Sequence, residues 1–140
     1  MKRTASANWQ GSGKEGKGTV SAQSGVLNNN QYSWSTRFAD GIGTNPEELI
    51  GAAHAGCFSM KLSFVIGAAG FTPDSIDTKA TVTLEDGSIN QIHLEVQAKV
   101  PGMDAEKFAE AAADAKANCP VSKLLNTNVT MNAVLVQLFF

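Results

Sequence analysis

The sequence has few cysteines and no excess of positive charge, and each shortage excludes a class of protein. Only two of the 140 residues are cysteine, which is too few for a disulfide-stapled scaffold. Eleven Lys and Arg against thirteen Asp and Glu leave a net charge of -2. Because nucleic-acid binding depends on clustered cations that neutralise phosphates, we expect no nucleic-acid partner. The chain also lacks a phosphate-cradling glycine loop and closely paired metal ligands, so we expect no cofactor and no metal.

Long apolar runs are also scarce, and the one that is present covers residues 49–71. It is about as long as a membrane span, but it contains His54 and Lys61 and follows Glu47 and Glu48. Charges inside a span are costly, so a buried helix in a soluble core explains the run better, and we expect no membrane partner. The basic N-terminus has no apolar run behind it, which predicts no secretory signal and a cytoplasmic protein with reduced thiols.

The composition, 43% hydrophobic and 17% charged, predicts one globular domain over residues 1–140. Alternating apolar residues predict a hairpin of strands at 18–27 and 32–38, a second hairpin at 76–84 and 92–100, and a closing strand at 129–138. Asp86-Gly87, a favoured turn pair, lies in the second hairpin. Helices are predicted over 46–69, 104–117 and 120–125. This order of elements indicates an α+β fold.

The first predicted helix has clear signals at both ends. Asn45 is a capping residue, Pro46 suits the first helical position, Glu48 sits where a capping-box acid belongs, and Gly70 is a left-handed terminator. Apolar residues surround most of the helix, so we expect it to be buried on nearly all sides. Small residues recur every four positions, at 51, 55 and 59. They indicate either tight packing on the chain's own sheet or a symmetric helix pair across a dimer axis.

The two cysteines are the obvious reactive residues, and their local settings differ. Cys57 lies in the middle of the apolar helix, where burial alone would raise its pKa and leave it an inert small hydrophobe. Cys119 occupies the N-cap position before Pro120, where unpaired N–H groups would stabilise a thiolate. Judged locally, Cys119 is the more activated thiol. His54 shares a helix face with Cys57, and we interpret it as a hydrogen-bonded core or interface histidine.

Several segments of the chain have distinctive sequences. Residues 43–60 read GTNPEELIGAAHAGCFSM, and residues 115–122 read AKANCPVS. Together with residues 17–21, 24–28, 35–38 and 70–77, they resemble the osmotically inducible protein C family over essentially the whole chain. The family has a second branch, the organic hydroperoxide resistance proteins. The sequence of the Thr-Arg-Phe segment and of Val121-Ser122 is more similar to the osmotically inducible branch than to that one.

The resemblance implies an OsmC-like fold, with antiparallel sheets around a long buried central helix in an intertwined homodimer. It also implies a thiol-dependent peroxidase of oxidative and osmotic stress defence that reduces organic hydroperoxides to alcohols. By resemblance Cys57 is the peroxidatic nucleophile and Cys119 the resolving thiol, which reverses the local argument. The family's active-site arginine falls on Arg37 and its carboxylate on Glu47. A Cys57–Cys119 disulfide would be recycled by an external dithiol such as dihydrolipoamide.

These roles agree with simple chemistry. A cation close to a thiol lowers its pKa, and the guanidinium of Arg37 can also orient a peroxide while Glu47 holds it in place. Without the resemblance, Arg37 would be an exposed strand residue and Glu47 a first-turn acid favoured by the helix dipole. Glu47 and Cys57 are ten residues apart, or about 15 Å along one helix. We therefore expect Glu47 of one subunit to approach Cys57 of the other.

Two other interpretations of the same residues remain open. One is a non-catalytic dimeric binding protein in which both cysteines are ordinary core residues. The other is a redox sensor that forms the same disulfide but signals instead of turning over. Near Cys57, an apolar entrance for bulky alkyl peroxides would use Phe58, Met60 and Phe64, although we expect at least Phe64 to pack in the core.

Overall fold

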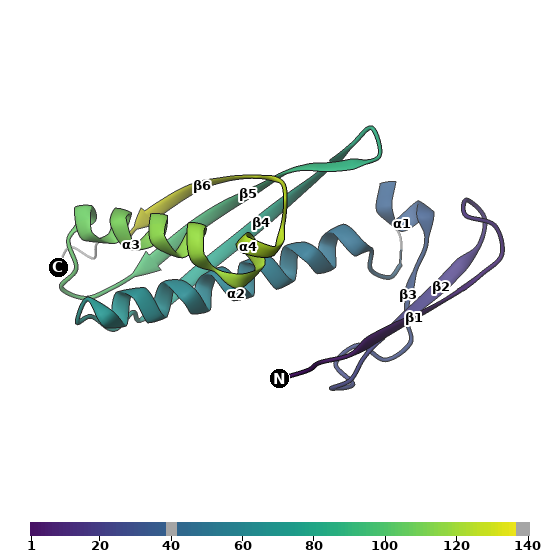
Figure 1. The fold of residues 1–140 in the computed structure, drawn as a ribbon, viewed down its shortest axis with the longest axis horizontal. Helices are drawn as coiled ribbons and strands as arrows, with labels where there is room; N and C mark the ends of the chain where they lie inside the picture. The colour runs from purple at the N-terminus through teal and green to yellow at the C-terminus, as the bar shows by residue number, and fades with distance from the viewer. Residues whose placement is uncertain (39–41, 137–140) are drawn as a thin grey trace. The chain divides into compact units, whose positions relative to one another are not determined.

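A computed structural model describes residues 1–38 and 42–136, and these form six strands and four helices. The strands form two separate three-stranded sheets (Figure 1). The chain divides into two compact units, Met1–Leu49 and Ile50–Phe140, which are described one at a time. A mixture of separate helices and sheets confirms the α+β class.

The first unit holds an antiparallel sheet in the order β1 (Ala5–Gln10), β2 (Lys17–Ala22) and β3 (Asn30–Tyr32). β2 pairs with the next strand along the chain, but it ends earlier than predicted, and its partner β3 overlaps the predicted second strand only at Tyr32. The expected second strand at 32–38 is wrong, since Trp34–Phe38 form the short helix α1. Arg37 therefore lies on a helix and not on a strand.

A reciprocal cap explains why the chain turns helical after Tyr32. The Ser33 Oγ accepts the Thr36 backbone N–H at 3.3 Å, and the Thr36 Oγ1 accepts the Ser33 backbone N–H at 3.0 Å. Two donors that would otherwise be unpaired at the helix start are thereby satisfied. The Ser33-x-x-Thr36 spacing was readable in the sequence, but the alternating apolar residues around it indicated a strand.

Helix α2 runs over Pro46–Ala68, close to the predicted range. Its predicted cap is confirmed, because the Asn45 Oδ1 accepts the Glu48 backbone N–H at 2.8 Å. The Glu48 carboxylate does not complete the expected capping box and instead accepts the Thr44 hydroxyl at 2.7 Å. At the other end Gly70 has φ +94°, and the Phe71 N–H reaches back to the Ile66 carbonyl at 3.2 Å, which is the predicted left-handed terminator.

The second unit is built on a sheet in the order β4 (Ser75–Glu85), β5 (Ser88–Lys99) and β6 (Asn128–Leu135). β4 and β5 form the predicted hairpin, with Asp86 at φ +51° and Gly87 at φ +77° in its turn. β6 pairs with β5 in parallel, so the expectation of purely antiparallel sheets is wrong. The chain crosses from the end of β5 through two helices before it enters β6, a connection typical of parallel strands. Positions 137 and 138 of the predicted closing strand lie outside the described residues.

That connection holds helices α3 (Ala105–Asn118) and α4 (Pro120–Leu124), both as predicted. Asp104 caps α3 by accepting the Lys107 backbone N–H at 2.8 Å. Cys119 ends α3 and also serves as the N-cap of α4, which confirms its predicted position. Phe108 is buried, as expected from its position in α3.

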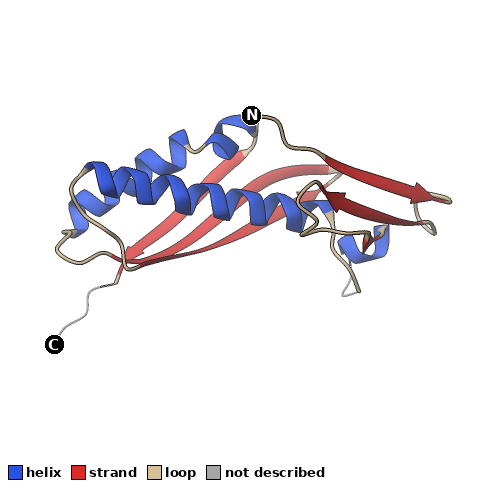
Figure 2. Ribbon diagram, turned by 90° about the horizontal axis from the view of Figure 1, so that it is seen from below, coloured by secondary structure: helices blue, strands red, loops and turns tan. Residues whose placement is uncertain are grey.

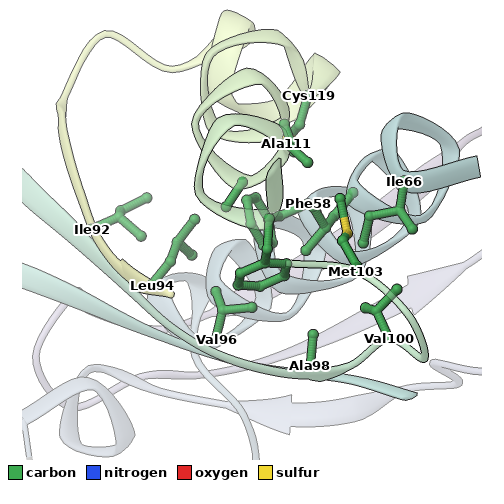
Figure 3. Packing of buried hydrophobic residues seen from close by; sticks show 14 residues of the cluster. Phe58, Ile66, Ile92, Leu94, Val96, Ala98, Val100, Met103, Ala111 and Cys119 are labelled. Atoms are coloured by element: carbon green, nitrogen blue, oxygen red, sulfur yellow. The ribbon is translucent and has the colours of Figure 1, made fainter. Parts of the chain in front are cut away.

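Within the second unit, α2 and α3 lie against one face of the β4–β5–β6 sheet (Figures 1 and 2). The core between these layers contains alternate residues of β5, as predicted: Ile92, Leu94, Val96, Ala98 and Val100. Phe58 of α2 and Phe108 of α3 are its largest members. Cys119 belongs to the same buried cluster (Figure 3).

Helix α2 is buried along one face only, which corrects the expectation of burial on nearly all sides. Its small residues pack on β4: a Cβ at Gly51 would contact Val82 at 3.4 Å, and the Ser59 hydroxyl bonds that of Thr78 at 2.7 Å. Packing on the chain's own sheet is therefore confirmed for this stripe. On another face, Met60 is 65% and Phe64 is 71% exposed. Among the described residues, α2 is the one helix long and apolar enough to cross a membrane, which is weak evidence for a span.

Candidate active site

Tertiary folding brings the two cysteines, 62 positions apart in sequence, into direct contact. Cys57 projects from the middle of α2 and Cys119 from the junction between α3 and α4. Both are free thiols, and their side chains hydrogen-bond to each other. Cys57 is half-buried, whereas Cys119 is fully buried. The arrangement offers one partly accessible sulfur with a second, sheltered sulfur beside it.

The turn that begins α4 supplies backbone donors to both sulfurs. The Ser122 N–H donates to the Cys119 Sγ at 3.4 Å, and the Val121 backbone donates to both thiols. A thiolate gains more from such donors than a thiol does, so they favour ionisation. This is the local effect expected at a cysteine that caps a helix.

The pKa values of the two thiols move in opposite directions. Burial raises the pKa of Cys57, the Val121 backbone partly offsets this, and the hydrogen bond with Cys119 raises it further. Burial also acts to raise the pKa of Cys119, but hydrogen bonds from the Ser122 side chain and backbone, from Cys57 and from Val121 outweigh it, so the pKa is lowered. These directions agree with the local sequence argument that Cys119 is the more activated thiol. A cation close to Cys57 would oppose the increase in its pKa.

His54 lies one helical turn before Cys57 and is fully buried, as expected for a core histidine. Its Nε2 hydrogen-bonds the Ser122 Oγ at 2.7 Å, while its buried Nδ1 has no partner within the described residues. Burial lowers the pKa of His54, which favours the neutral ring. In the part of the chain that the structure describes, no group of three or more His, Cys, Asp or Glu could hold a metal ion.

The other two residues singled out by resemblance lie in the first unit. The backbone of Arg37 is helical in α1, and its side chain is not among the described ones. Glu47 is half-buried in the first turn of α2, where an acid is favoured by the helix dipole. Their roles at Cys57 therefore stay predictions.

Two expectations about the surroundings of Cys57 are reversed. Phe64, expected in the core, is exposed, while Phe58, considered for an apolar entrance, is a fully buried core residue. Sequence reasoning also missed Ser122, which contacts both Cys119 and His54. Its signal was its position three residues after the capping Cys119, where a cap's side chain accepts a backbone N–H.

The sequence of the chain is similar to those of known proteins. Residues 39–134 match the family model described as OsmC-like protein. The chain is 53% identical over 130 residues to peroxiredoxin OsmC of Escherichia coli, covering 90% of this chain and 91% of that protein. It is 32% identical over 101 residues to organic hydroperoxide resistance protein-like 1 of Staphylococcus epidermidis, covering 67% and 70%.

A solved structure shows the same likeness in the fold. The crystal structure of the organic hydroperoxide resistance protein OhrB of Bacillus subtilis superposes with a TM-score of 0.65 at 26% identity, covering 95% of this chain and 98% of that one. The family model spans more than half of the chain, and the fold agrees with it. The chain belongs to the OsmC-like protein family.

Proposed function

We propose that this chain is a thiol-dependent peroxidase that reduces organic hydroperoxides to alcohols in cytoplasmic stress defence. One observation carries the proposal: a half-buried thiol, Cys57, is in contact with a fully buried second thiol, Cys119. Contact between the thiols provides a resolving partner for an oxidised Cys57. The 53% identity to a protein named peroxiredoxin supports the peroxidase class.

The proposed cycle has three balanced steps. The Cys57 thiolate attacks the terminal peroxide oxygen, the O–O bond breaks, and the leaving alkoxide takes up a proton to become an alcohol. Cys119 then attacks the Cys57 sulfenic acid, forming the S–S bond and releasing water. A dithiol such as dihydrolipoamide reduces the disulfide to two thiols and is itself oxidised to a disulfide.

Arg37 is proposed to supply the cation that Cys57 needs. Burial raises the pKa of Cys57, and the described residues that act on it are Val121, through its backbone, and Cys119. A guanidinium remains protonated at any relevant pH and pairs well with a carboxylate, so Arg37 held by Glu47 would stabilise the Cys57 thiolate. Because Glu47 and Cys57 are far apart along α2, we propose that Glu47 acts across a homodimer.

A thiol count tests the peroxidase directly. Reduced, desalted protein is treated with one equivalent of cumene hydroperoxide, and in parallel with hydrogen peroxide, and free thiols are then measured. We expect both thiols of each chain to disappear, faster with the organic peroxide. Repeated turnover with dihydrolipoamide as reductant distinguishes an enzyme from a redox sensor. Two surviving thiols would overturn the proposal and favour a non-catalytic binding protein.

The exposed face of α2 supports the proposed homodimer. It is apolar, with Met60 and Phe64 standing out among small residues, and a Cβ added at Gly56 or Gly67 would contact nothing within 4 Å. Large exposed apolar surfaces on soluble chains mark interaction sites. A second copy of α2 packed against this face would cover both large side chains.

Placing a charge on this face is expected to dissociate the dimer. For Phe64→Glu we expect the mass in solution to fall from that of two chains to that of one, since an unpaired carboxylate in an apolar interface costs several kcal/mol. Light scattering after size-exclusion chromatography measures it. Val26→Glu, at a position 81% exposed in the first unit, is the matched control and should keep the parent mass. A parent protein that is already monomeric would contradict the proposal.

A further inference from the structure

The mechanism above does not use His54, a buried titratable side chain that is hydrogen-bonded to the site. His54 is fully buried on α2, and its Nε2 contacts the Ser122 Oγ at 2.7 Å across a sequence separation of 68 residues. Ser122 in turn donates its backbone N–H to the Cys119 Sγ. A buried polar contact between distant segments, placed directly behind a reactive thiol, calls for an explanation.

The ring nitrogen of His54 that carries the proton decides which atom donates and which accepts in these hydrogen bonds. The buried Nδ1 has no partner within the described residues, so a proton there would be an unpaired buried donor, which proteins rarely tolerate. The neutral ring therefore carries its proton on Nε2 and donates it to the Ser122 oxygen. The Ser122 hydroxyl hydrogen is then free to point at Cys119.

We propose that His54 and Ser122 are positioning residues that hold a hydrogen-bond donor on Cys119 and so stabilise it as a thiolate. The order is His54 Nε2–H to Ser122 Oγ, and Ser122 O–H to Cys119 Sγ. Cys119 accepts the Ser122 backbone N–H as well. The lowered pKa of Cys119, with Ser122 as its largest favourable contributor, agrees with this arrangement.

The inference rests on the proposed function and assigns these residues to two of its steps. During resolution, the Cys119 thiolate attacks the Cys57 sulfur, the S–O bond breaks, and the departing hydroxide takes the proton that Cys119 released. During recycling, a dithiol thiolate attacks the half-buried Cys57 and Cys119 leaves as a thiolate. A leaving thiolate that is already stabilised departs faster, so the same donor serves both steps.

Kinetics of disulfide formation test the inference. After one equivalent of cumene hydroperoxide, we expect Ser122→Ala to form the Cys57–Cys119 disulfide about three- to tenfold more slowly than the parent at neutral pH. The deficit should disappear at alkaline pH, where Cys119 ionises without help. His54→Met should slow the reaction in the same direction. His54→Gln, whose amide nitrogen can donate from a similar position, should restore much of the rate.

A matched control separates this effect from general loss of a buried hydroxyl. Ser59→Ala removes a hydroxyl on α2, the helix that carries His54, and the hydrogen bond of this hydroxyl is to Thr78 at 2.7 Å. This variant should form the Cys57–Cys119 disulfide at the parent rate. A parent-like rate in Ser122→Ala at neutral pH, or a deficit that is equal at every pH, would overturn the inference.

A second measurement keeps the inference independent of peroxide chemistry. In a Cys57→Ser background, the thiolate absorbance of Cys119 is titrated with and without Ser122→Ala. We expect the titration to move to higher pH when the hydroxyl is lost, and an unchanged titration contradicts the inference. If the titration moves but the parent forms neither sulfenic acid nor disulfide with peroxide, the proposed function fails while the role of His54 and Ser122 stands.

Discussion

Replacing Cys57 with serine is expected to reduce hydroperoxide turnover by at least about a thousandfold. A serine hydroxyl stays protonated at neutral pH and cannot supply the anionic nucleophile that attacks the peroxide. Alcohol release from cumene hydroperoxide in the presence of excess dihydrolipoamide measures the loss. The buried neighbour cannot compensate, because Cys119 has no exposed surface.

The matched variant is Cys119→Ser, which should leave the first step intact. This protein is expected to consume about one equivalent of peroxide and then stop, with Cys57 held as a sulfenic acid that a diketone probe can trap. The opposite pattern, a burst from Cys57→Ser and none from Cys119→Ser, would exchange the roles of the two thiols. The lowered pKa of Cys119 makes this comparison necessary, since ionisation alone favours Cys119 as nucleophile.

Replacing Phe58 with alanine is expected to lower the free energy of unfolding by about 3–5 kcal/mol. Phe58 follows Cys57 directly, is fully buried, and fills the core between α2, α3 and β5 (Figure 3). Its removal leaves a cavity that the layers cannot close without moving the helix that carries Cys57. Urea unfolding at a fixed protein concentration measures the change, since a dimer's stability depends on concentration.

Phe58→Leu is the graded control for this prediction. Leucine restores much of the lost apolar volume, so we expect a cost below about 1.5 kcal/mol. If alanine costs no more than leucine, Phe58 does not fill the core as its burial indicates. The pair of variants thereby tests the position of α2 on the sheet without using any activity.

Local signals in the sequence determined where most elements begin and end. Asn45 with Pro46, Asp104, and Asp86-Gly87 each act through contacts within a few residues, so they could be identified without the fold. The apolar alternation of β5 likewise determined which of its side chains are buried. The family also followed from the sequence, because its motifs are contiguous.

Two predictions failed, each for a different physical reason. At Trp34–Phe38 a reciprocal Ser33–Thr36 cap prevailed over apparent alternation, and a helix formed in place of a strand. On α2, apolar residues all around the helix predicted burial on nearly all sides. Within the second unit the β4–β5–β6 sheet covers one face of this helix, and Met60 and Phe64 on another face remain exposed.

The site itself depended on tertiary structure. No local pattern reveals that Cys57 contacts Cys119 or that His54 reaches Ser122, because these contacts join α2 to the α3–α4 junction across more than 60 residues. The parallel pairing of β6 with β5 also depends on tertiary structure, because the helices α3 and α4 must return the chain to the end of the sheet where β5 begins. Caps and turns are decided by neighbours in sequence, whereas the pairing of thiols and the polarity of the hydrogen-bond chain behind them are decided by packing between layers. The sequence by itself therefore determined the elements and the family of this protein, and only its tertiary structure decided which side chains act together.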